Sequence, residues 1–161
     1  MKLALSLALL SVLLLSADAL AQTAPAAPAP SAGRILVVLS AENRLTLRDG
    51  KVHPTGFFLS ELAGPTQALR RAGYQLAFAT PGGRAAVMDR SSDQDQYFPR
   101  PEERKAAREF VDQLDLGHPL SLQSLGEKEL AGFAGLFIPG GHAPMEDLYQ
   151  DKELGGASQI R

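Results

Sequence analysis

A glutamate at the start of one apolar segment is the first candidate for chemistry. Glu61 lies within TGFFLSELAGP, residues 55–65. In the first turn of a helix, its carboxylate would be stabilised by the positive helix end, and Pro65 should kink the helix by clashing with the Glu61 carbonyl. Beside Phe57 and Phe58, such a carboxyl group would be partly buried, and burial favours its neutral, hydrogen-bond-donating form. An ordinary solvated glutamate fits the same spacing, so both interpretations stay open.

A glycine pair after another apolar run is the second candidate. The run 136–138 leads into Pro-Gly-Gly and then His142, within LFIPGGHAPMEDL. Gly140 and Gly141 let the backbone approach a ligand closely, and N–H groups exposed at such a turn can form half of an oxyanion hole. A tight turn without a ligand is the commoner use of a Gly-Gly pair. His142 could act as a base or a ligand, although a single histidine after a turn is more often a rim residue.

The remaining residue types exclude several kinds of site. The chain has no cysteine, so it offers no thiol nucleophile, thiolate metal ligand or disulfide. His53 and His118 stand beside prolines, no histidine pair has the i, i+4 spacing of a helical zinc site, and no G-x-S-x-G elbow is present. We therefore expect no metal and no cofactor, with only a metal site built from residues distant in sequence left open. The motif at 89–91, Asp-Arg-Ser, could hydrogen-bond near the site but is weak.

Alternating apolar runs and helical periodicities must position these residues. Buried strands are predicted at 34–40, 74–80 and 135–138, and helices at 57–72, 101–114 and 127–133. Loops are expected at 41–56 and 84–100, and a short strand or extended segment at 120–125. The alternation predicts an α/β fold with a parallel sheet.

In such a fold the ligand site lies beyond the carboxyl ends of the strands. The segments expected at this rim of the sheet are 40–61, 80–91 and 139–148. They contain the candidate residues Glu61, Gly141 and His142, which we therefore expect to lie at one end of the sheet.

Four segments in order carry a family resemblance. TGFFLSELAGP, RRAGYQLAFATPGG, DRSSDQD and LFIPGGHAPMEDL resemble the ThiJ/PfpI family of the class I glutamine amidotransferase-like superfamily, over about residues 34–150. The most similar branch is the glyoxalase III and heat-shock chaperone group, which has a similar Asp-Gly, Thr-Gly-Phe and Gly-Gly-His arrangement. The resemblance implies a flavodoxin-like parallel sheet with helices on both faces and, commonly, a homodimer.

The resemblance also implies an activity. In this family a cysteine on a nucleophile elbow, usually within Cys-His-Gly, attacks the carbonyl carbon of a small reactive aldehyde such as methylglyoxal. Glyoxalase III members, also described as D-lactate dehydratases, form lactate without glutathione, and other members are peptidases, deglycases or chaperones. By resemblance, Glu61 hydrogen-bonds the cysteine and Gly141 helps to form the oxyanion pocket, with a small carbonyl compound as substrate.

The chain departs from the family pattern where the nucleophile is expected. The family's elbow lies on the next strand, after a helix that should begin near Glu146, but the sequence has no fourth core strand and no Cys-His-Gly. We expect a sheet that is incomplete on its C-terminal side, through a frameshift, a premature stop or a fragmentary sequence, in which Glu61 and Gly141 are vestigial. In a 2-1-3-4 strand order, the strand at 135–138 would then be an apolar, unpaired edge that invites association.

Two functions follow. One is a glyoxalase III-like enzyme activity, which we expect in full-length relatives but not in this chain, because it lacks the cysteine. The other is a non-catalytic, chaperone-like or binding remnant.

The first residues indicate export. Lys2, an apolar stretch at 3–15 and Ala19-Leu20-Ala21 predict a signal peptide over 1–21, since the stretch is shorter than the roughly 20 residues of a membrane span. The Ala/Pro-rich segment 22–32 is expected to be a linker, and 33–161 the partial domain. We expect a periplasmic or secreted protein without a membrane anchor after cleavage, which the N-terminal residue of the exported protein would check.

Charge patterning argues against nucleic acid as a partner. The formal net charge is −2, and the densest cationic stretch, 100–108, is interleaved with Glu102, Glu103 and Glu109. That pattern is typical of a solvated helix face rather than a binding patch.

Overall fold

The computed structural model describes residues 31–157 of the chain. The expected signal peptide, 1–21, and residues 22–30 of the expected linker lie outside the described residues, as do residues 158–161.

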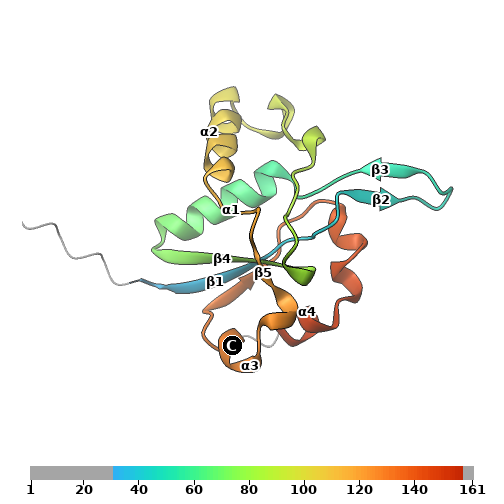
Figure 1. Cartoon of the computed structure of the whole chain (residues 1–161). Coiled ribbons are helices and arrows are strands. Elements are labelled where there is room, and N and C mark those ends of the chain that lie inside the picture. Colours follow the sequence, from blue (N-terminus) through green and yellow to red (C-terminus); the bar gives the residue numbers. More distant parts are fainter. Residues whose placement is uncertain (1–30, 158–161) are drawn as a thin grey trace, which may run out of the picture.

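A four-stranded parallel sheet forms the centre of the protein (Figure 1). In spatial order its strands are β5 (Leu120–Ser121), β4 (Tyr74–Thr80), β1 (Gly33–Val38) and β6 (Gly135–Phe137). Each neighbouring pair is parallel. The three strands predicted from apolar runs are confirmed, with the first strand lying between the second and the third.

Helices cover both faces of the sheet, as the flavodoxin-like prediction requires. Figure 1 shows α1 (Leu59–Arg71) and α2 (Pro101–Asp112) on one face, and α3 (Glu127–Leu130) and α4 (Lys152–Ala157) on the other. Each layer of helices closes its own apolar cluster against the sheet. Within residues 31–157, no helix is long and apolar enough to cross a bilayer.

Strand β1 supplies the centre of both clusters. Ile35 and Val37, with Leu39 just past the end of the strand, belong to the cluster beneath α1 and α2, whereas Leu36 and Val38 belong to the cluster on the opposite face. Successive side chains of a strand point to opposite faces, so a strand covered on both sides must be apolar throughout. This is why the continuous run in β1 predicted a central strand correctly.

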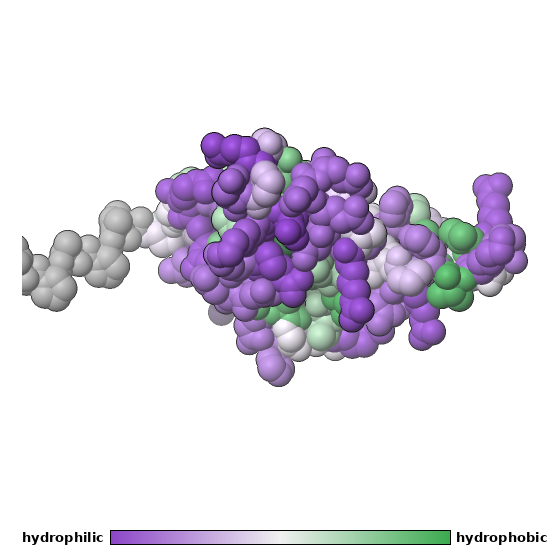
Figure 2. All heavy atoms as spheres, turned by 90° about the horizontal axis from the view of Figure 1, so that it is seen from above, coloured by the Kyte–Doolittle hydropathy of each residue, from purple (hydrophilic) through white to green (hydrophobic). Residues whose placement is uncertain are grey.

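The predicted loop 41–56 is wrong in part, because it contains a β-hairpin. Strands β2 (Arg44–Thr46) and β3 (Val52–Pro54) pair antiparallel, and Gly50, at φ +79°, closes the turn with its N–H donating to the Leu47 carbonyl. A hydrogen bond from Lys51 lowers the pKa of Asp49 at this turn. The hairpin projects from the body of the molecule, with apolar side chains near its end (Figure 2): Leu47 is 41% exposed and Val52 58%.

The predicted helix over 57–72 begins too early. Phe58 is extended, and α1 starts at Leu59, because Phe57 is used in extended bridges to two neighbouring segments. The helix then runs without interruption through Pro65 to Arg71. Gly73, at φ +89°, follows its end as expected.

Three further boundaries differ from the sequence prediction. Helix α2 ends at Asp112 rather than residue 114, and α3 covers only Glu127–Leu130. The segment 120–125 divides into β5 and a single turn of 3-10 helix at Leu122–Ser124. Helix α3 and strand β5 carry too few residues for a periodic pattern to fix their ends, and the two-residue difference at the end of α2 is of the size at which helix ends fray.

Strand β6 is an edge of the sheet in the described chain. It pairs with β1 through Gly135, Leu136 and Phe137, and no described strand pairs with its other side. Leu136 and Phe137 are half-buried, and Ile138 is 41% exposed. The backbone groups along the outer side of β6 therefore form the kind of open edge that invites pairing.

We expect the chain to self-associate through this edge. Ile138→Lys places a charge beside β6 without removing a buried side chain, and charged residues block edge pairing. Sedimentation velocity over a concentration series should show less association for Ile138→Lys than for the unmodified chain. Leu120→Lys, equally exposed at 42% on the opposite edge strand β5, is the matched control and should leave association unchanged. An unmodified chain that stays monomeric, or two variants that behave alike, would contradict the prediction.

Candidate functional site

The rim segments predicted to meet at the carboxyl ends of the strands do meet. Phe57 forms a parallel bridge to Met88 on one side and an antiparallel bridge to Gly141 on the other. The Phe57 N–H donates to the Val87 carbonyl at 2.9 Å, and the Phe58 N–H donates to the Gly140 carbonyl at 3.3 Å. We call this three-segment arrangement the rim ladder. It brings together residues from the segments that follow β4 and β6 and from the start of α1.

The Pro-Gly-Gly turn requires glycine at its second glycine. Gly141 has φ +118°, and a Cβ there would lie 2.4 Å from the Gly56 carbonyl oxygen. Backbone approach this close excludes any side chain. Within residues 31–157, the Gly141 N–H donates no hydrogen bond. That amide can therefore serve a ligand oxygen, as the oxyanion role expected for Gly141 requires.

The Glu61 carboxylate lies directly over the same turn. A Cβ on Gly140 would be 2.2 Å from Oε2 of Glu61 and 2.8 Å from its carboxyl carbon. Gly140 has no positive φ, so its missing side chain serves to make room for the carboxylate. The structure thus joins Glu61 and the glycine pair, which the sequence singled out separately.

Of the two interpretations left open for Glu61, the partly buried one is wrong. Its side chain is exposed and, among the described residues, it makes no hydrogen bond or ion pair. Phe57 and Leu62 point into the apolar core instead, so neither covers the carboxylate. The solvated alternative therefore describes this residue, with its two oxygens free to accept hydrogen bonds.

His142 follows the turn but has no supporting partner in the described chain. Its side chain is exposed and makes no hydrogen bond there. A histidine base is normally oriented by a second group, and none is provided by the residues that the structure describes. The other histidines lie elsewhere: His53 is on β3, and His118 contacts Asp115 at 3.0 Å. No group of three metal-binding side chains occurs in residues 31–157.

Two buried polar residues support the site, and the sequence indicated only one of them. Asp89 is 6% exposed, and its Oδ1 accepts hydrogen bonds from the Ser91 N–H at 2.8 Å and hydroxyl at 2.6 Å. Ser92 is fully buried, and its hydroxyl accepts from the Leu59 N–H at the start of α1, at 3.0 Å. The Asp-x-Ser pattern of a local side-chain turn could have revealed the first contact. No local signal reveals the second.

The segment after the glycine turn is tied to the end of β1. Asp147 accepts hydrogen bonds from the Ser40 hydroxyl at 2.7 Å and from the Ala41 N–H at 2.8 Å. Glu146 accepts from the Thr46 N–H of the hairpin. These carboxylates fix 139–148 against the rim, so they are structural rather than free for chemistry.

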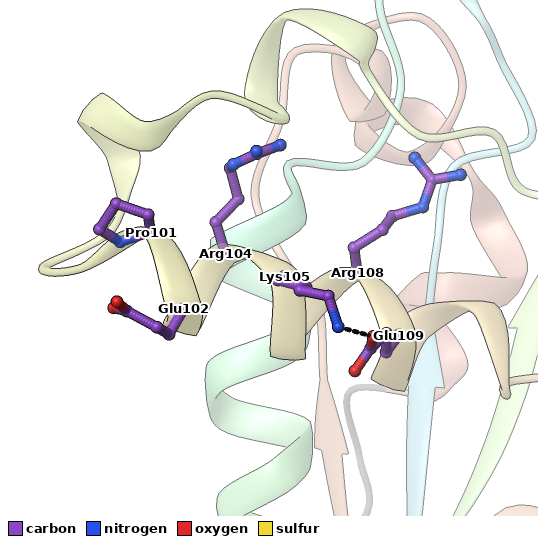
Figure 3. A pocket seen from close by; sticks show the side chains of 6 residues that line it. All are labelled: Pro101, Glu102, Arg104, Lys105, Arg108 and Glu109. Carbon is purple, nitrogen blue, oxygen red and sulfur yellow. Dashed lines mark hydrogen bonds and ion pairs between the residues drawn. The ribbon is translucent and has the colours of Figure 1, made fainter.

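A surface hollow of about 410 Å³ lies on the outer face of α2 (Figure 3). Its cationic side chains are paired with carboxylates. Asp93 accepts from Arg104 at 2.9 Å and from Arg108 at 3.3 Å, and Lys105 pairs with Glu109. The hydrogen bonds that Arg104 donates to Asp93 and then to Asp95 raise the pKa of Arg104. This is the solvated helix face that the charge pattern predicted.

Comparison with known proteins places the fold. No family model and no curated protein matches the chain. Glyoxalase III from Candida albicans superposes with a TM-score of 0.58 at 21% sequence identity, over 78% of this chain and 51% of that one. The Rapid Encystment Protein 24 kDa of Francisella tularensis gives 0.58 at 18%, over 78% and 52%. These likenesses show the fold alone, a flavodoxin-like α/β fold with a parallel sheet.

A third solved structure, of a protein that carries only a code name, is 26% identical, with a TM-score of 0.55 over 79% of this chain and 50% of that one. The chain therefore spans about half the length of the solved structures that it resembles. In this flavodoxin-like fold, the rim ladder occupies the carboxyl end of the parallel sheet, where ligands bind in open α/β folds.

Proposed function

We propose that the chain supplies the acid and glycine-turn half of a glyoxalase III-like site for small reactive aldehydes such as methylglyoxal. The apposition of the Glu61 carboxylate and the Gly140–Gly141 turn carries the proposal. An amide N–H that donates no other bond can donate to the carbonyl oxygen of a small aldehyde, and a solvent-facing carboxylate can accept from a hydroxyl group on the same molecule or its adduct.

The roles follow from the chemistry of each group. The Gly141 N–H donates to the carbonyl oxygen and stabilises the negative charge that develops there when a nucleophile adds to the carbon. Glu61 accepts a proton from the nucleophile or from the substrate hydroxyl and returns it later, which is general acid–base catalysis. His142 is exposed beside this turn, and we assign it no step.

The covalent step needs a thiolate from outside these 161 residues, because the sequence contains no cysteine. As given, the chain should bind a small carbonyl compound without converting it. Glu61 and Gly141 then act as a binding site rather than a catalytic one. Export and homodimerisation remain predictions from the sequence.

Binding can be tested without turnover by using hydroxyacetone, which keeps the oxygen spacing of methylglyoxal but has no aldehyde. In ¹⁵N-resolved NMR titrations we expect shifts at the amides of Gly140, Gly141 and Phe58. The Gly82–Gly83 turn at the end of β4 is the internal control and should not respond. Glu61→Gln should weaken binding by about tenfold, the usual effect of removing a charged hydrogen-bond partner.

Shifts confined to the α2 face, or none at any concentration, would refute this function.

The alternative function, a chaperone-like remnant, has its own support in Leu47 and Val52, which are exposed on the projecting hairpin. Suppression of client aggregation by a chain that does not bind hydroxyacetone would favour that alternative.

A further inference from the structure

Asp89 and Ser92, at the two ends of a short turn, are buried and make several hydrogen bonds to other segments and within the turn. Besides its two bonds from Ser91, Asp89 accepts from the Thr55 hydroxyl through Oδ2 at 3.5 Å. The Ser92 hydroxyl donates to the Asp89 carbonyl at 2.6 Å while accepting from Leu59. Asp89 and Ser92 are buried, and neither touches the reacting groups proposed above.

Ser92 performs a task that the helix cannot perform for itself. The first N–H groups of a helix have no partner within it, and a side-chain oxygen at the N-cap usually satisfies one. The N-cap of α1 is Phe58, which has no such oxygen and makes no side-chain cap bond. Ser92 supplies the acceptor from a different segment, and so fixes where α1 begins. Glu61 is the third residue of that helix.

The same turn also holds the other side of the site through the rim ladder. The Asp89 N–H donates to the Phe57 carbonyl at 3.0 Å, and Phe57 in turn bridges to Gly141. The backbone of Gly56 packs tightly against the segment 87–89. A Cβ on Gly56 would lie 2.1 Å from the Val87 carbonyl oxygen and 2.7 Å from the Asp89 nitrogen. A displacement of the turn must therefore move the start of α1.

We propose that the Asp89–Ser92 turn is the positioning element of the site: it sets the start of α1 so that the Glu61 carboxylate lies over Gly140. The use of that carboxylate rests on the proposed function, but the positioning does not. Asp89 and Ser92 act through Leu59 and Phe57, so they are positioning residues rather than catalytic ones.

The test follows the Gly140 amide by NMR as pH is varied. In the unmodified chain its chemical shift should titrate with Glu61, and Glu61→Gln should abolish that titration. Ser92→Ala should reduce the amplitude by about twofold or more, because the electrostatic influence of a charge falls with distance. It should also speed hydrogen exchange at Leu59 by about fivefold, the typical effect of a lost N-cap bond.

Ser124→Ala is the matched control. Its hydroxyl makes one bond of similar length, 2.8 Å to the Ser121 carbonyl, at the exposed turn after β5. It should leave the Gly140 titration unchanged. An unchanged titration in Ser92→Ala, or a Gly140 shift that still titrates in Glu61→Gln, would overturn the proposal.

A second measurement needs no variant and covers the case in which Ser92→Ala does not fold. In native-state hydrogen exchange of the unmodified chain, the amides of Phe57, Phe58, Leu59 and Asp89 should open as one unit with a common free energy. Separate opening of Asp89 and Leu59 would overturn the proposal. If these tests support the positioning role but hydroxyacetone does not bind, the proposed function is refuted and this inference still holds.

Discussion

The 161-residue chain should release no lactate from methylglyoxal above the rate in buffer alone. Conversion requires a nucleophile that adds to the aldehyde carbon, and the chain contains no cysteine. In the proposed site, Gly141 polarises a carbonyl group and Glu61 transfers a proton, but neither can form the covalent bond. Loss of the nucleophile from a site whose residues act as a unit lowers kcat by about 10⁶-fold in a well-studied hydrolase, which would place any residual rate below detection.

An enzymatic assay of lactate, with C. albicans glyoxalase III as the positive control, measures this directly. Glu61→Gln separates the two ways in which the expectation can fail. Lactate formation that persists in Glu61→Gln points to a contaminating enzyme. Formation that disappears in Glu61→Gln shows that another group in the chain acts as the nucleophile, and the account of this site is then wrong.

Gly141→Ala should destabilise the fold by about 2–6 kcal/mol, through backbone strain of about 1–3 kcal/mol and overpacking of about the same size. Gly141 has φ +118°, and the new Cβ would lie 2.4 Å from the Gly56 carbonyl oxygen. That oxygen belongs to the backbone of the rim ladder, so it cannot move aside as a side chain would. Chemical denaturation should show the loss as a lower midpoint with an unchanged slope.

Gly82→Ala is the control for backbone strain alone. Gly82 also has a positive φ, +69°, but a Cβ there meets nothing within 4 Å. Its cost should be about 1–2 kcal/mol, the penalty of the left-handed conformation. Equal losses in the two variants would show that the Pro-Gly-Gly turn relaxes freely and that the close approach to Gly56 carries no energy.

The sequence predicted the fold correctly where a hydrophobic pattern is long and fits one kind of secondary structure better than any other. The apolar runs in β1 and β4 could only be buried strands, and helical periodicity located α1 and α2. The hairpin β2–β3 was missed because each strand has three residues, too few to establish an alternation of period two. Physical context, rather than local preference, decides such short strands.

The sequence predicted which residues form the site, but not how exposed they are or which buried residues hold them in place. Glu61 and the glycine pair stood out by residue type and by family resemblance, and the structure brings them together. The exposure of Glu61 depends on which groups surround its carboxylate in space, and two nearby apolar residues, Phe57 and Leu62, point into the core instead. Ser92 escaped notice because its partner, Leu59, is 33 residues away.

The bonds between Asp147 and the end of β1 have a consequence for synthesis of the chain. Ser40 and its partner Asp147 are 107 residues apart, so at ordinary elongation rates the ribosome makes the second about 5–20 s after the first. Strands β1 and β4 can pair early in that interval, since they leave the ribosome before the other two strands of the sheet, β5 and β6. Until β6 and Asp147 follow, Leu36 and Val38 on the second face of β1 face water, and the nascent chain presents its most apolar strand to whatever binds it.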